Sequence, residues 1–325
     1  MAQFIIPDRN TSSEMRYQMG WALSDLAYEF PQIRAFDADL RSSTGLHIFE
    51  HFHPEKLIKA GIAEQLMISM AAGFSQEGFI PFTCTFDAFS RRFMDQLYVT
   101  VAYSDLNVKM IGAYAGLFTG KAGASHQSDK ELGFLLRVPR LTVLEPSCND
   151  EMRQALRIAA TEHGPFYLRL VRCSVDENSI YSGYEFRVGR GVTVLDDGYD
   201  AGLITTGQSL AQARKAAEIL ARKGIRVRID HHPSLKPFDR ELVRDLASKV
   251  PAIVTCENHC ISGGLFSLVA ETLVQEGYGT RVMPIGSDPD DFIHTGHVND
   301  LAYHYRMRAV DIAGKVEYLL RDRYE

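Results

Sequence analysis

The sequence contains little cysteine, with five residues in 325 and no Cys-x-x-Cys pair. They are Cys84, Cys148, Cys173, Cys256 and Cys260. An odd number of scattered thiols argues against a disulfide framework and favours a reducing compartment. A zinc site on the last two would need two further ligands at suitable spacing, so we interpret the thiols as buried and free.

Long apolar runs and an excess of basic residues are also missing. Apolar segments such as 66–74 are much shorter than the roughly 20 residues that a membrane-spanning helix needs. The amino terminus lacks the basic start and apolar core of a signal peptide. The net charge of −6 argues against a general nucleic-acid-binding protein. We therefore expect a cytoplasmic protein that acts on small molecules, without nucleic acid or a membrane as partner.

Apolar runs alternate with helical patterns, which predicts an α/β fold of two domains, each a mainly parallel sheet with helices on both faces. In the first half we predict strands at 33–37, 80–83, 108–113, 141–144 and 166–170, and helices at 13–28, 64–76, 89–103 and 150–162. In the second half we predict strands at 201–205, 226–230 and 252–256, and helices at 208–223, 240–248, 264–275 and 310–321.

A polar, turn-rich stretch interrupts this alternation near residues 173–190, where Gly183 and Gly189 stand among serine and aspartate residues. Such a stretch is typical of a linker. We expect a first domain at 1–175, a linker at 176–190 and a second domain at 191–325.

The stretch 61–65, Gly-Ile-Ala-Glu-Gln, begins a helix that is otherwise filled with apolar residues. A carboxylate at a helix start is electrostatically favourable, so Glu64 could simply cap the helix. An acid in apolar surroundings is nevertheless costly unless it has a partner, which is typical of a functional group. The residue type alone leaves these two interpretations balanced.

Two phenylalanines and an arginine follow the strand that ends near Cys84. Phe86 and Phe89 could line a flat pocket that stacks on a heteroaromatic ring, or could simply pack in the core. Arg92, one turn further on, could hold an anion or form an ordinary ion pair.

A glycine-rich loop at 113–127 follows the next predicted strand. Glycines with few charges suit a loop that approaches a ligand closely, although the spacing matches neither a dinucleotide fingerprint nor a phosphate-binding loop. His126 in this loop could orient a substrate or shuttle protons, but a single histidine is more often structural.

In this order and spacing, these segments resemble the carboxy-terminal half of a transketolase, and the resemblance extends over 15–16, 36–40, 166–172 and 257–264. It implies thiamine diphosphate as the cofactor. Glu64 matches the glutamate that contacts the aminopyrimidine ring, where a carboxyl group can exchange a proton that an amide could not. The resemblance assigns Phe86 and Phe89 to packing around the pyrimidine and places Asp39 among the cofactor-binding residues.

The resemblance also implies an anionic substrate. Arg16, Ser43 and Arg172 match the arginines and serine that hold a sugar phosphate, and guanidinium groups suit oxyanions. His126 matches a histidine beside the substrate and is assigned as catalytic. Arg92 is assigned to substrate binding because related deoxyxylulose-phosphate synthases carry arginine there, where many transketolases have an aromatic residue.

Two positions depart from the transketolase pattern. Tyr114, assigned to the substrate site, stands where transketolases have a phosphate-binding histidine. Ala122 stands where they have an aspartate that binds a substrate hydroxyl, and an alanine cannot accept that hydrogen bond. These changes put the ordinary pentose-phosphate substrates in doubt.

The Gly-Asp-Gly motif that binds Mg²⁺ and diphosphate in thiamine enzymes is missing; the nearest string, at 196–198, is Asp-Asp-Gly. We therefore expect no metal ligand in this chain. A separate amino-terminal subunit would bind Mg²⁺ and the diphosphate, and this chain would form a homodimer within a heterotetramer. The second domain would serve assembly, with Glu257 and His259 as structural residues.

The resemblance thus predicts a subunit of a split transketolase that moves a two-carbon ketol unit from a phosphorylated or otherwise anionic ketose to an aldehyde. The nearest alternative is the beta subunit of a 2-oxo-acid dehydrogenase, which has a similar length and cofactor half-site. A non-catalytic scaffold subunit that keeps only the fold is a second alternative, although a scaffold would not need Glu64 and His126.

Overall fold

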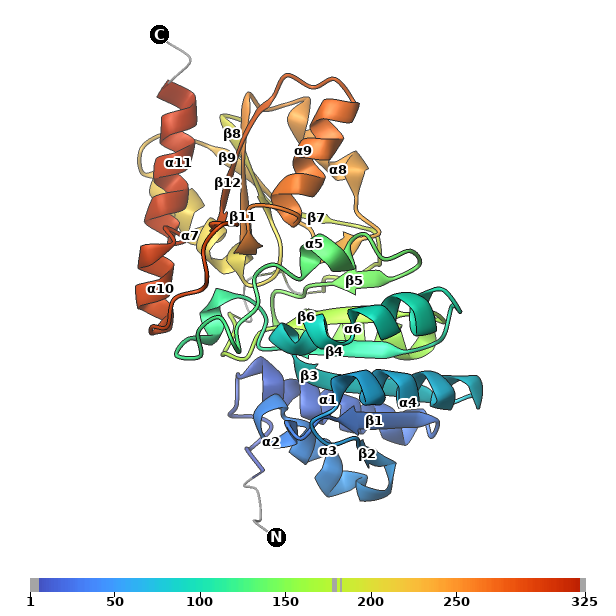
Figure 1. The fold of residues 1–325 in the computed structure, drawn as a ribbon. Helices are drawn as coiled ribbons and strands as arrows, with labels where there is room; N and C mark the ends of the chain where they lie inside the picture. Colours follow the sequence, from blue (N-terminus) through green and yellow to red (C-terminus); the bar gives the residue numbers. More distant parts are fainter. Residues whose placement is uncertain (1–5, 177–179, 182, 322–325) are drawn as a thin grey trace.

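Two β-sheets, each with helices on both faces, make up the molecule (Figure 1). The computed structural model describes residues 6–176, 180, 181 and 183–321. The carboxy-terminal half of the chain lies above the amino-terminal half in this view. The predicted class, two α/β domains with mainly parallel sheets, is confirmed.

The first sheet has seven strands in the order β10-β5-β6-β4-β3-β1-β2. All its neighbours are parallel except β10, which runs antiparallel to β5. The strands are β1 (Ile33–Asp37), β2 (Leu57–Lys59), β3 (Ile80–Phe86), β4 (Lys109–Ala113), β5 (Thr142–Leu144), β6 (Phe166–Leu170) and β10 (Ser234–Lys236).

Helices bury apolar side chains against both faces of this sheet. One face is covered by α1 (Met15–Glu29), α3 (Leu46–Phe52) and α6 (Asn149–Thr161), whose Met19 and Met152 share a buried cluster with Phe82. The other face is covered by α4 (Glu64–Gln76) and by a π-helix, η3 (Gln96–Ala102). Short elements connect them: α2 (Arg41–Thr44), η1 (Pro54–Lys56), η2 (Asp87–Arg92), η4 (Leu117–Thr119) and α5 (Leu132–Leu135).

The second sheet has five strands in the order β12-β11-β8-β9-β7, and only β7 is antiparallel to its neighbour. Its strands are β7 (Val192–Asp196), β8 (Ala201–Thr205), β9 (Val227–His231), β11 (Ala252–Cys260) and β12 (Arg281–Ser287). Its helices are α7 (Ser209–Ala221), α8 (Arg240–Ala247), α9 (Leu265–Gln275), α10 (Val298–His304) and α11 (Ala309–Arg321). None of the described helices is long and apolar enough to span a bilayer.

The two halves share a sheet edge and a hydrophobic core. Strand β10 leaves the second half of the chain to pair with β5 at the edge of the first sheet. Leu246 and Leu265 of the second half lie in one buried cluster with Met67 and Val143 of the first. Apolar burial on this scale resists relative movement of the two sheets.

The helix predicted at 89–103 is present as two shorter elements rather than as one continuous helix. The chain forms the 3₁₀ turn η2 and then the π-helix η3 there. Phe93, Leu97 and Val101 recur every four residues and are buried, which a helical pattern predicts, but that pattern does not distinguish an α-helix from a π-helix. Four strands were not predicted: β2, β7, β10 and β12.

None of the five cysteines forms a disulfide, as expected, and all of them are buried except Cys173, which is partly exposed. Cys256 and Cys260 lie on one strand, β11. The predicted linker at 176–190 includes residues 177–179 and 182, which lie outside the described residues.

Candidate functional site

The predicted site residues lie around the carboxyl ends of β1, β3 and β4 in the first sheet. These strands are parallel neighbours, so the segments that follow them leave the sheet at one edge. The segment after β3 carries Phe89 and Arg92, and the loop after β4 carries Tyr114 and His126.

Glu64 is the first residue of α4, and its side chain is only 3% exposed. Its Oε2 lies 3.6 Å from Nη1 of Arg92, whose own side chain is 61% exposed. The carboxylate faces a shallow hollow lined by Arg92 and by the exposed apolar side chains of Ile62 and Leu66. A buried carboxyl group with one solvent-exposed partner has room to bond to a ligand: it accepts a hydrogen bond when ionised and can donate one when protonated.

Four aromatic rings form a connected group beside this hollow. Phe86 stacks on Tyr114 with ring centroids 4.1 Å apart and an interplanar angle of 26°. Phe89 lies 5.6 Å from Phe86, and the ring of His126 meets that of Phe89 edge-on at 5.5 Å. The guanidinium of Arg92 lies 5.6 Å from the centre of the Phe89 ring. The structure thus brings Glu64, Arg92 and the aromatic residues together.

A polar group adjoins the aromatic rings at Tyr114 and consists of Arg16, Ser43, Tyr114 and Arg172. Arg16 Nη1 donates to the Tyr114 hydroxyl at 3.1 Å and to the Ser43 carbonyl at 3.2 Å. The guanidinium of Arg172 lies 5.2 Å from the Tyr114 ring centre. Glu14 accepts from Arg16 Nε at 2.7 Å and therefore balances part of the positive charge.

A glycine makes this arrangement possible. Gly45 follows α2 with a φ of +90°, and a Cβ at that position would lie 2.0 Å from the backbone oxygen of Arg16. Only glycine allows the turn after Ser43 to approach α1 so closely.

The loop that carries Tyr114 and His126 is held by the second half of the chain. Asn258 of β11 accepts from the Leu117 N–H at 2.8 Å and donates to the Ala115 carbonyl at 3.3 Å. Gly116 has a φ of +73°, and a Cβ there would lie 2.1 Å from Asn258 Nδ2. Tyr114 itself has a φ of +65°, a strained conformation for a bulky residue that often occurs at functional sites.

Asp39 lies apart from these groups. It follows β1 at the same sheet edge, its side chain is 60% exposed, and its Oδ1 lies 3.5 Å from Arg41 Nη1. The structure records no contact between Asp39 and the other predicted site residues in the described part of the chain. Its predicted role with the cofactor stays a prediction.

Sequence reasoning missed a buried charge network directly behind the aromatic group. Arg169 is ion-paired with Glu131 and Glu145, and its Nη2 donates to the Asn258 carbonyl at 2.8 Å. Asp87, which follows Phe86, accepts from the Tyr167 hydroxyl. Burial, together with the nearby charge of Glu131, raises the pKa of Asp87 well above its usual range. No local signal could have found these partners, because they lie on different strands and loops far apart in the sequence.

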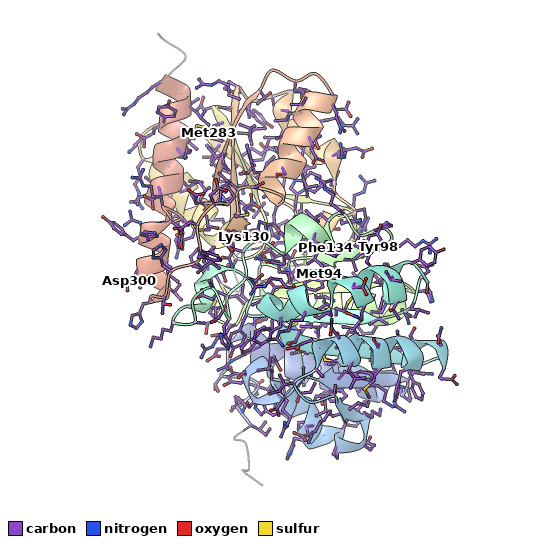
Figure 2. All side chains as sticks on the ribbon, in the orientation of Figure 1. Met94, Tyr98, Lys130, Phe134, Met283 and Asp300 are labelled. Atoms are coloured by element: carbon purple, nitrogen blue, oxygen red, sulfur yellow. The ribbon has the colours of Figure 1, made fainter. Side chains whose placement is uncertain are left out.

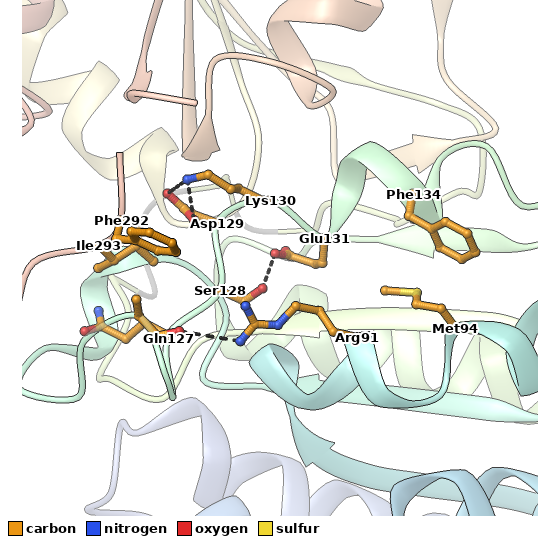
Figure 3. Close-up of a pocket in the computed structure, with 11 residues that line it drawn as sticks. Arg91, Met94, Gln127, Ser128, Asp129, Lys130, Glu131, Phe134, Phe292 and Ile293 are labelled. Carbon is orange, nitrogen blue, oxygen red and sulfur yellow. Dashed lines mark hydrogen bonds and ion pairs between the residues drawn. The ribbon is translucent and has the colours of Figure 1, made fainter. Parts of the chain in front are cut away.

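A second cavity lies beyond this network (Figure 3). It is bounded by Arg91 and Met94, by the segment 127–134, and by Phe292 and Ile293 of the second half. Figure 2 shows Met94, Tyr98 and Phe134 on the same side of the molecule, with Lys130 between the two sheets.

Comparison with known proteins identifies the family. Residues 12–176 match the transketolase pyrimidine-binding domain, and residues 190–293 match the transketolase C-terminal domain. The chain belongs to the transketolase family. Both matched regions correspond to the carboxy-terminal half that the sequence resembles.

Three similar proteins are separate transketolase subunits or sections. A transketolase C-terminal section from Methanocaldococcus jannaschii is 34% identical over 306 residues, which cover 93% of this chain and 95% of that protein. A 6-deoxy-6-sulfo-D-fructose transketolase subunit from Clostridium sp. strain MSTE9 is 37% identical over 275 residues, 81% of this chain and 84% of that protein. The solved structure of a split-gene transketolase, an inactive β4 tetramer, is 35% identical with a TM-score of 0.86 and covers 95% of this chain and 98% of that one.

Proposed function

We propose that this chain is the carboxy-terminal subunit of a split, thiamine-diphosphate-dependent transketolase of the cytoplasm. It would transfer a two-carbon ketol unit from a phosphorylated or otherwise anionic ketose to an aldehyde. The observation that carries the proposal is the buried Glu64 carboxylate, which faces a hollow lined by Arg92, whose guanidinium lies beside the aromatic group.

The residues present fit the pyrimidine half of the cofactor. Glu64 offers a carboxyl group with one ion-pair partner, and the tilted rings of Phe86 and Phe89 offer aromatic surface for a heteroaromatic ring. When bound, thiamine diphosphate supplies a carbon nucleophile that also accepts the electron pair released in carbon–carbon cleavage. Glu64 would hold the proton that is exchanged with the aminopyrimidine nitrogen, and Asp39 is assigned to the same cofactor site.

The polar residues of the site would bind and orient the sugar. Arg16 and Arg172 would neutralise the anionic end of the ketose, with Ser43 as a neighbouring hydroxyl. His126 is exposed and its Nδ1 lies 2.8 Å from the Ser125 hydroxyl, so its Nε2 is left to exchange a proton with a substrate hydroxyl. Arg92 would hold a second substrate oxygen or shield Glu64.

A separate subunit would complete the active site. Gly-Asp-Gly does not occur in the sequence, so Mg²⁺ and the diphosphate are assigned to a partner chain. Ile62 and Leu66 are 75% and 51% exposed beside Glu64, and apolar side chains at this place suit contact with that partner. The relatives described as subunits, and the solved split-gene protein, support a separate partner subunit. The proposed assembly is a homodimer of this chain within a heterotetramer.

The substrate would differ from the ordinary pentose phosphates. Tyr114 fills the place of a phosphate-binding histidine and is already bonded to Arg16 and to the Ser43 carbonyl. Ala122 offers no acceptor for a substrate hydroxyl. The Clostridium relative is described as acting on a sulfonated fructose, so the donor panel should include sulfonated as well as phosphorylated ketoses.

The experiment combines this chain with the product of the adjacent gene, as the candidate diphosphate-binding subunit, adds thiamine diphosphate and Mg²⁺, and measures ketol transfer from each donor. We expect turnover from the pair and none from either chain alone. Turnover by the isolated chain would contradict the split-subunit proposal. Acyl transfer to a lipoyl domain without ketol transfer would favour the 2-oxo-acid dehydrogenase alternative, and an inactive pair that still assembles would favour a scaffold.

The Ala122→Asp variant tests the assignment of the substrate contact. If Ala122 lies at the substrate hydroxyls, the added carboxylate should shift activity toward hydroxylated aldehydes. Unchanged acceptor preference in an active variant would remove residue 122 from the site.

A further inference from the structure

Three side chains of metal-binding type converge on the surface of the second domain, outside the candidate site. Asp291, His294 and His304 each offer one ligand atom, and these atoms lie within 4.8 Å of one another. Within the described ranges, no other set of three histidine, cysteine or carboxylate side chains is close enough to hold an ion. Asp291 and His294 belong to the loop 288–297, and His304 ends α10. Asp300 marks this helix at the left edge of Figure 2.

The geometry of the group is close to that of a bound ion. His294 Nε2 lies 3.2 Å from Asp291 Oδ2, and the rings of His294 and His304 are 4.6 Å apart. Tetrahedral zinc with bonds of about 2.0–2.1 Å separates its ligand atoms by about 3.3 Å. His294 Nε2 and Asp291 Oδ2 therefore already have the required spacing. The ligand nitrogen of His304 needs to move by at most about 1.5 Å to complete the ligand set. All three side chains are exposed, so rotation about their side-chain bonds allows this movement.

A tyrosine connects the two elements that carry these ligands. The Tyr305 hydroxyl accepts from the His294 N–H at 3.0 Å and donates to the Phe292 carbonyl at 3.5 Å. Its ring also meets the ring of His304 edge-on, with centroids 4.8 Å apart. The backbone is thus held in place on both sides of the group, which reduces the entropy lost on binding an ion.

We propose that Asp291, His294 and His304 form a site for one divalent transition-metal ion of the zinc class, with water in the remaining positions. Two imidazole nitrogens and one carboxylate oxygen suit Zn²⁺, Co²⁺ or Ni²⁺, whereas Mg²⁺ and Ca²⁺ require sets of oxygen ligands. The site is distinct from the proposed Mg²⁺ site, which is assigned to the partner subunit.

The ion would act as a structural clamp on the loop that supports the candidate site. The Gly296 carbonyl accepts from the Lys121 N–H at 2.7 Å, and Lys130 Nζ donates to the Asp291 carbonyl at 2.8 Å. Gly123 packs so closely that a Cβ there would lie 2.5 Å from Thr295 Oγ1. Figure 3 shows Phe292 and Ile293 of the same loop facing Asp129. Fixing the loop 288–297 on α10 would therefore steady the segment that carries His126.

The test uses the full chain without an affinity tag, stripped with EDTA and titrated calorimetrically with ZnCl₂ and, separately, with MgCl₂. We expect one equivalent of Zn²⁺ to bind, a higher unfolding temperature with Zn²⁺, and no response to Mg²⁺. Loss of a ligand in His294→Ala or His304→Ala should weaken zinc binding at least about tenfold. Bound Co²⁺ should give a visible absorption band in the wild-type chain but not in His294→Ala or His304→Ala.

His297→Ala is the matched control, because His297 lies on the same exposed loop but outside the group. This variant should bind Zn²⁺ as the wild type does, and all variants should unfold at the wild-type temperature in EDTA. Undiminished zinc binding by the double variant His294→Ala/His304→Ala would overturn the proposal, as would equal weakening by His297→Ala. The absence of stoichiometric binding to the wild-type chain would reduce the group to a surface ion pair between Asp291 and His294.

Discussion

Each sheet places a buried glutamate at the start of a helix, and the two glutamates differ in their partners. Glu257 of β11 is fully buried, and its two oxygens accept from the N–H groups of Leu265 and Phe266 at 2.6 and 2.9 Å, at the start of α9. Glu64 is itself the first residue of α4, and its carboxylate contacts only the exposed Arg92 among the described residues. One carboxylate is satisfied within the chain, and the other faces a hollow.

This difference separates a structural acid from an acid that is available to a ligand. A Cβ on Gly264 would lie 2.1 Å from Glu257 Oε2, so there is no room for another molecule at that carboxylate. Glu64 is bordered by exposed apolar side chains and by the aromatic group. The hydrogen bonds and close packing of Glu257 agree with the prediction that it is structural. The assignment of Glu64 to the cofactor remains a proposal that can be tested against it.

The largest expected effect is on turnover by Glu64→Gln in the complex with the partner subunit. The amide keeps the size of the side chain but cannot exchange the proton, so kcat should fall by about 10²- to 10⁴-fold. Steady-state ketol transfer measures this, and the unfolding temperature should stay at the wild-type value. Turnover by Glu64→Gln at the wild-type rate would remove the proposed role of Glu64.

The second expected effect is on stability, and it concerns Glu257. Glu257→Ala leaves two buried N–H groups at the start of α9 without acceptors, which should lower the free energy of unfolding by about 2 to 4 kcal/mol. Glu64→Ala is the matched control and should cost less than about 1 kcal/mol, because the hollow beside it is open to water. Urea denaturation of both variants checks the contrast. If both variants lose the same free energy of unfolding, Glu64 and Glu257 contribute equally to stability and the contrast between them is wrong.

The sequence pattern predicted the residues around Glu64, but it did not predict the contacts that make Glu64 and Glu257 differ. The apolar helix after Glu64, the spacing of Phe86 and Phe89, and the glycine-rich loop are local signals, and the structure brings these residues together. By contrast, Asn258 holds the loop at Leu117 across more than a hundred residues of sequence. No local periodicity encodes such a contact, because it depends on how the two sheets pack.

The same limit explains the errors in the fold. Strand β10 has three residues and pairs with the sheet of the other half, so neither its length nor its neighbours in sequence indicate its place. The segment 96–102 has the burial pattern of a helix, and its π geometry depends on packing against α4. Long, strongly periodic elements such as α4 were predicted with their bounds.

The third expected effect is a pH dependence of the free energy of unfolding, and it concerns Glu257. Burial raises its pKa to about 8 from the ordinary value of 4.5. The folded chain therefore binds more protons than the unfolded chain between these values. The resulting stabilisation is fully present below pH 4.5 and is lost as the pH rises to about 8, with a slope of at most about 1.4 kcal/mol per pH unit.

Glu257→Gln, which does not titrate, isolates this contribution. The difference in unfolding free energy between wild type and Glu257→Gln, measured in urea from pH 5 to pH 8, should shrink or reverse as the pH rises. A difference that stays constant over this interval would show that Glu257 is ionised throughout. Burial is the main reason that the pKa of Glu257 is raised. A constant difference would therefore also mean that water reaches this carboxylate in the folded chain.

The smallest expected effect is on substrate affinity. It tests whether the Tyr114 hydroxyl helps the candidate site to bind the anionic end of the ketose. Tyr114→Phe keeps the stack on Phe86 but removes the hydroxyl that accepts from Arg16 and donates to Ser43. One hydrogen bond of about 1 kcal/mol predicts a rise of about fivefold in KM for an anionic donor, with kcat almost unchanged. Tyr199→Phe, which removes a hydroxyl bonded to Asp196 on the surface of the second domain, is the matched control and should leave KM unchanged. If both variants leave KM unchanged, the contacts of Arg16 with Tyr17, Glu14 and the Ser43 carbonyl are enough to hold it, and Tyr114 serves the aromatic stack rather than the binding of the anion.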